Sequence, residues 1–91
     1  MTTASKIKNG IINAIRLVLL SEWDPLCIGD NPMLRDEYDR YISKIYRLVI
    51  GNAKEDTIAA ELKDIETKEI GIDRDMSGAN AAAKKIVSLK Q

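Results

Sequence analysis

The amino-acid sequence predicts an all-α fold, a compact bundle of about four helices that forms a single domain over residues 1–91. Apolar residues recur at spacings of three and four in four separate segments, which is typical of helices that bury one side. No segment alternates apolar and polar residues for long enough to predict a strand. A chain of 91 residues suffices for one hydrophobic core and leaves no room for a second domain. With no Phe and one Trp, that core is expected to consist mainly of Ile, Leu, Val and Ala.

The first helix is expected over residues 3–21. Ile12 and Leu20 lie off its main apolar stripe, so we expect this helix to be central and covered on more than one side. Gly10 predicts a close approach by another helix. The stripe itself consists of Ile7, Ile11, Ala14, Ile15, Val18 and Leu19.

An ordered loop or a pair of turns is expected next, over residues 22–33. Three dipeptides that a helix interior does not accept follow one another there: Asp-Pro at 24–25, Gly-Asp at 29–30 and Asn-Pro at 31–32. Trp23 either anchors a partner or fills the core, and we favour the core. For Cys27 we favour a buried small apolar residue over a reactive thiol, because no basic residue lies nearby in sequence.

The second helix is expected over residues 34–50 and has the clearest periodicity in the chain. Asp36, Glu37 and Asp39 fall in its first turns, where the helix dipole favours acidic residues. Tyr46 sits towards the edge of the apolar arc and is the aromatic residue we expect to be partly exposed. The residues of the arc, all expected in the core, are Tyr38, Tyr41, Ile42, Ile45, Leu48 and Val49.

Two further helices complete the predicted bundle. The third covers residues 54–69 and ends at Gly71, with an inward side formed by Ile58, Ala59, Leu62 and Ile65. Residues 72–78 are polar and form a connection. A short final helix then carries apolar residues at Ala79, Ala82, Ile86 and Leu89.

The residue types argue against an enzyme. Histidine is absent, which removes the commonest general base and the commonest metal ligand. The acidic residues that open the second helix are better explained as dipole partners than as a cation site. No glycine-rich phosphate loop follows a strand, and no basic run is interleaved with aromatic residues. We therefore predict no catalytic residue, no cofactor, no metal site and no nucleic-acid binding.

A cytoplasmic location is expected. The single cysteine excludes an internal disulfide. The longest apolar run, residues 15–20, is interrupted by Arg16 and is far shorter than the roughly 20 residues that cross a bilayer. Lysines precede apolar residues near the N-terminus, as in a secretion signal, but no small-residue cleavage site follows. We interpret that stretch as a helix of the mature protein.

The 14 basic and 14 acidic residues cancel, but they are segregated along the chain. Residues 22–39 contain six acidic residues and one basic residue, and residues 55–75 contain eight acidic and three basic residues. Each segment therefore carries a net charge of −5. Either the two are ordinary solvated faces, or they form one acidic surface that meets a basic partner, where complementary charge would speed encounter and select the partner.

Several short motifs give the sequence a family resemblance. They are Glu-Trp-Asp-Pro-Leu at 22–26, Asp-Glu-Tyr-Asp-Arg-Tyr-Ile at 36–42, Ile-Glu-Thr at 65–67 and Ile-Gly-Ile at 70–72. In this order and spacing they resemble the YugE-like domains, small bacterial helical proteins of unknown function. The resemblance covers about residues 7–90. The sequence departs from the family in the loop at 27–34 and in having Ile-Gly-Ile where the family has Met-Gly-Leu.

The resemblance implies an all-helical fold, no known catalytic activity and, by analogy, a role as an immunity protein against a contact-dependent growth-inhibition toxin. The shared motifs are interpreted as scaffold: Trp23 packs inward near Tyr38, Asp24 bonds to backbone donors, and Pro25 stops the first helix.

The expected partner is a protein toxin, a nuclease with a basic surface, which an acidic face would cover. The residues predicted to bind it are Asp30, Asp36, Glu37, Asp56 and Asp64. The alternative is a homodimeric structural or regulatory adaptor that pairs through an apolar patch formed by Ile12, Leu20 and Tyr46.

Overall fold

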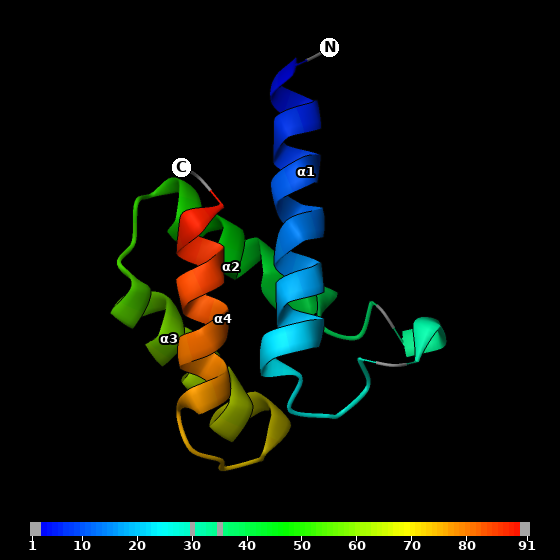
Figure 1. Cartoon of the computed structure of the whole chain (residues 1–91), viewed down its shortest axis with the longest axis vertical. Coiled ribbons are helices and arrows are strands. Elements are labelled where there is room, and N and C mark those ends of the chain that lie inside the picture. The colour runs from blue at the N-terminus through cyan, green and yellow to red at the C-terminus, as the bar shows by residue number, and fades with distance from the viewer. Residues whose placement is uncertain (1–2, 30, 35, 90–91) are drawn as a thin grey trace.

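The structure is a computed structural model that describes residues 3–29, 31–34 and 36–89. All regular elements within these residues are helical, so the predicted all-α class is confirmed (Figure 1). The four α-helices are α1 (Thr3–Val18), α2 (Asp39–Ile50), α3 (Glu55–Asp64) and α4 (Ser77–Ser88). Three short helical segments accompany them: the π-helical turns η1 (Leu19–Trp23) and η3 (Ile65–Ile70), and the 3₁₀ turn η2 (Pro32–Leu34).

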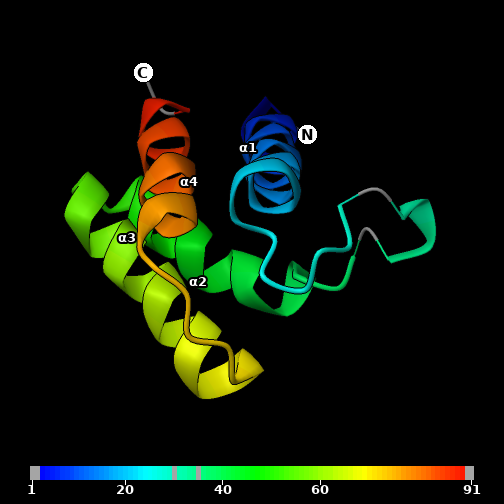
Figure 2. The ribbon, with the colours of Figure 1, turned by 60° about the horizontal axis from the view of Figure 1, so that its bottom comes forward.

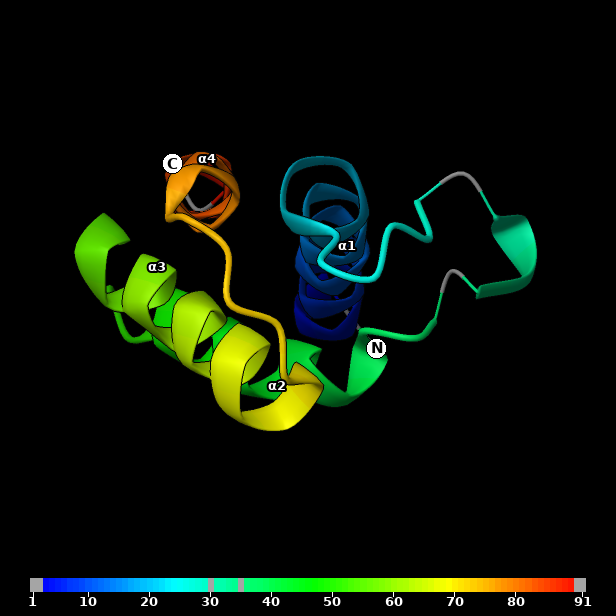
Figure 3. The same ribbon diagram turned by 90° about the horizontal axis from the view of Figure 1, so that it is seen from below.

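The helices are arranged in two layers. Seen from below, α1 and α4 are viewed nearly end-on, whereas α2 and α3 run across beneath them (Figure 3). The most extensive packing is between α3 and α4, and α1 packs on α2. The segment η1, which follows α1, also packs on α4. It therefore connects the α1–α2 pair with the α3–α4 pair. None of the described helices is long and apolar enough to cross a membrane.

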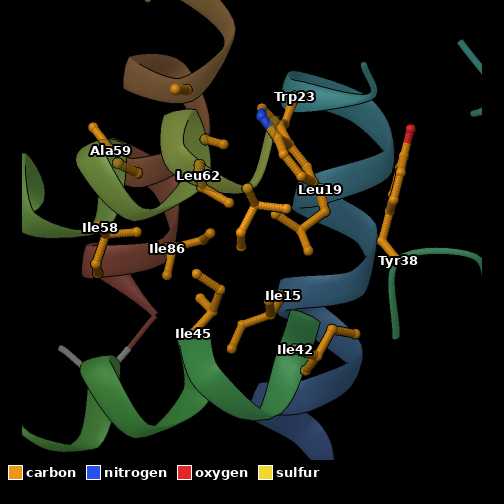
Figure 4. Packing of buried hydrophobic residues seen from close by; sticks show 14 of the residues in the cluster. Ile15, Leu19, Trp23, Tyr38, Ile42, Ile45, Ile58, Ala59, Leu62 and Ile86 are labelled. Carbon is orange, nitrogen blue, oxygen red and sulfur yellow. The ribbon is translucent and has the colours of Figure 1, made fainter. Parts of the chain in front are cut away.

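The core lies where the two layers meet, and every α-helix contributes to it (Figure 4). Four alanines and aliphatic residues make up most of it, as the composition predicts, and the small alanine side chains let α4 lie close to its neighbours. The buried residues of the helices include Ile15, Leu19, Ile42, Ile45, Val49, Ile58, Ala59, Leu62, Ile65, Ala79, Ala82, Ala83 and Ile86.

Trp23 and Tyr38 are fully buried, which confirms their predicted place in the core. Their ring centroids are 5.2 Å apart, so the predicted proximity of the two residues is also confirmed. Tyr41 packs against Trp23 edge to face at the margin of the core and is only half-buried. Tyr46 is partly exposed, as predicted, and Lys8 Nζ lies 5.5 Å from its ring centroid.

The predicted start of the second helix is wrong. Asp36 and Glu37 lie in turns that precede α2, and the helix begins at Asp39. The amide of Glu37 donates to the carbonyl of Leu34, and the amide of Asp39 donates to the carbonyl of Asp36. These bonds join residues three apart, which is turn or 3₁₀ geometry and not the four-residue spacing of an α-helix.

Two residue assignments also need correction. Cys27, predicted to be buried, is exposed because it lies in the loop outside the bundle, with a left-handed backbone (φ 56°). Gly10 is exposed, and a Cβ built on it would meet no atom within 4 Å, so no helix packs closely there.

Candidate partner-binding surface

The predicted partner-binding carboxylates lie at two places on the molecule. Asp36 and Glu37 are exposed in the turns before α2, whereas Asp56 and Asp64 are exposed on α3. Asp30 lies outside the described residues. Because α2 separates the first pair from the start of α3 and its 12 residues span about 18 Å, Asp36 and Glu37 lie at the opposite end of α2 from Asp56.

Asp56 and Asp64 share one face of α3. Together with Thr57, Ala60 and Glu61 they line a shallow depression in the surface. Asp64 follows Asp56 by eight positions, which corresponds to about 12 Å along the helix axis. The two carboxylates are therefore about two helical turns apart along this face.

This α3 face is less acidic than its carboxylates suggest. Lys68 Nζ lies 2.9 Å from Asp64 Oδ1, one turn along the helix, and Lys44 Nζ of α2 lies 2.9 Å from Glu61 Oε2. These contacts involve exposed lysines and stabilise the fold only slightly, but each one places a positive charge beside a carboxylate. Asp56 forms no ion pair with any described residue.

Other acidic residues of the two segments are paired with cations from elsewhere in the chain. Arg16 of α1 binds Asp39, with Nε 2.8 Å from Oδ1, and Lys85 of α4 binds Glu22 at 3.0 Å. The pKa of Arg16 is raised, chiefly by its hydrogen bond to Asp39. Cations from outside thus compensate two of the five net negative charges of residues 22–39 and, through Lys44 beside Glu61, one of the five of residues 55–75. The exposed carboxylates without an ion pair to a described residue include Asp36, Glu37, Glu55, Asp56 and Glu69.

A buried ion pair that the sequence analysis missed joins η3 to the connection before α4. Glu66 is 1% exposed; its Oε1 accepts from Arg74 Nη2 at 3.1 Å, and its Oε2 accepts from the Arg74 amide at 3.1 Å. Arg74 Nη2 also donates to the carbonyl of Trp23 at 2.8 Å. The pair therefore ties η1, η3 and the segment after Gly71 together.

The charge state of this pair follows from its contacts. Burial by itself would raise the pKa of Glu66, but the hydrogen bonds and charge of Arg74 outweigh burial and hold that pKa below its ordinary value. The same hydrogen bond raises the pKa of Arg74. One signal for the pair was present in the sequence: Glu66 follows Leu62 by four residues and so falls on the apolar side of the third helix.

A second polar cluster holds the base of the loop between η1 and α2. Asp24 Oδ1 accepts from Tyr38 Oη at 2.7 Å and from the Ile28 amide at 2.9 Å, and Oδ2 accepts from the Gly29 amide at 2.8 Å. Tyr38 Oη in turn accepts from the Leu26 amide at 2.9 Å. The prediction that Asp24 bonds to backbone donors is confirmed. Burial raises the pKa of Tyr38, so its hydroxyl remains protonated and donates to Asp24.

The alternative apolar patch is not present as predicted. Leu20 is buried in the core, with only 8% of its surface exposed, while Ile12 and Tyr46 are half-buried. Leu20 fails as a surface residue because the π-helical turn η1 directs the end of the first helix onto α4.

The described residues offer no group of three or more carboxylates or thiols placed to hold a metal ion. A depression beside η1 is lined by Glu22, Arg74, Asp75 and Ser77, but each of these side chains already has a partner within the fold. Searches of protein-family models, of curated proteins and of solved structures found no significant match to this chain.

Proposed function

We propose that this chain is a cytoplasmic immunity protein that binds and neutralises a cognate bacterial toxin of the contact-dependent growth-inhibition type. The toxin is a nuclease, and the immunity protein acts by covering a basic surface at or beside its active site. In this role the chain performs no catalysis of its own.

The observation that carries the proposal is the set of exposed carboxylates that form no ion pair with any described residue. Asp36 and Glu37 lie together before α2, and Asp56 opens the exposed face of α3. A nuclease site that binds the phosphates of nucleic acid is positively charged. Unpaired carboxylates would meet it without first losing an internal partner, and their field would speed the encounter.

The proposal is tested with the toxin domain encoded next to the gene for this chain. The tagged chain should retain that domain in a pulldown, and cells that make the chain should survive expression of the domain. Absence of any neighbouring toxin domain, or a neighbouring domain that is neither retained nor neutralised, would overturn the proposal.

Charge-reversal variants show which of the two acidic sites, the turns before α2 or the exposed face of α3, contacts the toxin. Glu37→Lys and Asp56→Lys each reverse an exposed carboxylate that has no ion pair with a described residue, and the two lie at opposite ends of α2. If the substituted residue lies in the interface, the association rate constant should fall by about tenfold. That rate constant should also depend less on salt concentration, since electrostatic steering is lost. Glu69→Lys is the matched control for net charge, because Glu69 is also exposed and has no ion pair with a described residue. Equal association rates for all three variants would contradict binding through either acidic place.

A further inference from the structure

The connection between η1 and α2 is long for so small a domain. It extends from residue 24 to residue 38, 15 residues in which η2 is the only helical segment described. Connections in helical bundles usually take 2–8 residues, and an ordered loop of this length commonly carries a function.

The base of this loop is held firmly although the loop is long. The Asp24–Tyr38 hydrogen bond joins its first residue to its last. The amides of Leu26, Ile28 and Gly29 are bound within the same cluster. The side chains of Asp24 and Tyr38, at the two ends of the loop, therefore hold the base of the loop in place on the bundle.

Residues 31–34 stand away from the helical body (Figure 2). Met33 is 85% exposed and Leu26 is 44% exposed, so these two apolar side chains add little to the core. Ordering a loop residue costs about 1 kcal/mol of conformational entropy, and at Met33 burial of the side chain does not offset that cost. Pro25 is buried and Ile28 packs against the core, so packing accounts for the base of the loop but not for the position of Met33.

We infer that this loop enters the toxin, with Leu26 and Met33 filling an apolar pocket while Asp36 and Glu37 face lysine or arginine residues on the rim of that pocket. The inference rests on the proposed function and names the partner surface it requires. Two properties of the loop select this partner. Unbranched Met adapts to an irregular apolar pocket, and the neighbouring carboxylates are exposed without ion pairs to described residues.

The test compares two double variants of the full chain against the purified toxin domain from the neighbouring gene. Leu26→Ala with Met33→Ala removes the loop side chains. Leu17→Ala with Met76→Ala is a matched control, because these residues are also an exposed Leu and Met but lie on α1 and just before α4. Binding is measured by calorimetry. The single variant Met33→Asp tests the same contact without unfolding the protein, because a side chain that is 85% exposed can carry a charge without cost to the fold.

The loop double variant and Met33→Asp are each expected to bind the toxin domain at least tenfold more weakly, because they remove or alter a central interface anchor. The control is expected to bind as tightly as the unmodified chain. Unchanged affinity of the loop variants, or equal losses in the loop and control variants, would overturn the inference and leave the proposed function standing. Failure of the unmodified chain to bind the toxin domain would overturn both.

Discussion

At the residue scale, the Glu66–Arg74 pair combines burial with charge. Glu66 is buried, whereas the side chain of Arg74 is 39% exposed. Removing one partner therefore has unequal effects. Without the Arg74 side chain the buried carboxylate keeps only Lys63 Nζ, 3.5 Å from Oε2, and the amide of residue 74 as partners, and Oε1 loses its donor. Without Glu66 the guanidinium still reaches water and the Trp23 carbonyl.

Arg74→Ala is accordingly expected to lower the free energy of unfolding by about 2 kcal/mol, and Glu66→Gln by only about 1 kcal/mol. Urea denaturation at neutral pH measures both. Combining Arg74→Met with Glu66→Leu should recover much of the loss, because an apolar pair of similar volume leaves no buried charge. If Glu66→Gln proved the more destabilising single change, the assignment of the buried charge would be wrong.

The lowered pKa of Glu66 also makes stability depend on pH. Its folded pKa lies below the ordinary value of 4.5, so the unfolded state binds its proton first as the pH falls. The contribution of Glu66 is therefore fully present well above pH 4.5 and is lost as the pH falls through 4.5 to the folded pKa. Urea midpoints between pH 7 and pH 3 should fall less for Glu66→Gln than for the unmodified chain. Parallel curves for the two proteins would contradict this.

At the scale of the elements, the helices could be predicted because apolar spacing is a local property. Boundaries were less predictable: the spacing extends the second helix back to residue 34, but three-residue hydrogen bonds hold that segment as turns. The acidic segments are visible in the sequence, but the cations that pair with their carboxylates could not be predicted from it. The partners of Asp39 and Glu22 lie on α1 and α4, 23 and 63 residues away, and only tertiary packing brings them together.

The loop between η1 and α2 gives a prediction of its own. Tyr38→Phe keeps the buried ring but removes the hydroxyl that binds both Asp24 and the Leu26 amide. It should lower the free energy of unfolding by about 1 kcal/mol and speed hydrogen exchange at the Leu26, Ile28 and Gly29 amides. Tyr46→Phe is the control, because no hydrogen bond of its hydroxyl to a described residue is observed. Equal exchange in the two variants would show that the cluster does not hold the loop.

At the scale of the whole molecule, scaffold and proposed binding surface are separate. The motif residues Trp23, Asp24 and Tyr38 hold the core and the base of the loop. The exposed carboxylates and the projecting apolar residues have no such role in the fold. Substitutions on that surface are therefore expected to change binding with little effect on stability, usually within about 0.5 kcal/mol.

The proposed function requires that the molecule bind a basic toxin domain. Calorimetric titration of the toxin domain from the neighbouring gene with the unmodified chain, at about 50 mM and about 500 mM salt, tests it most directly. We predict saturable binding that weakens at the higher salt concentration, accompanied by loss of the toxin's nuclease activity. No binding at either salt concentration, or binding that leaves the nuclease active, would contradict the claim.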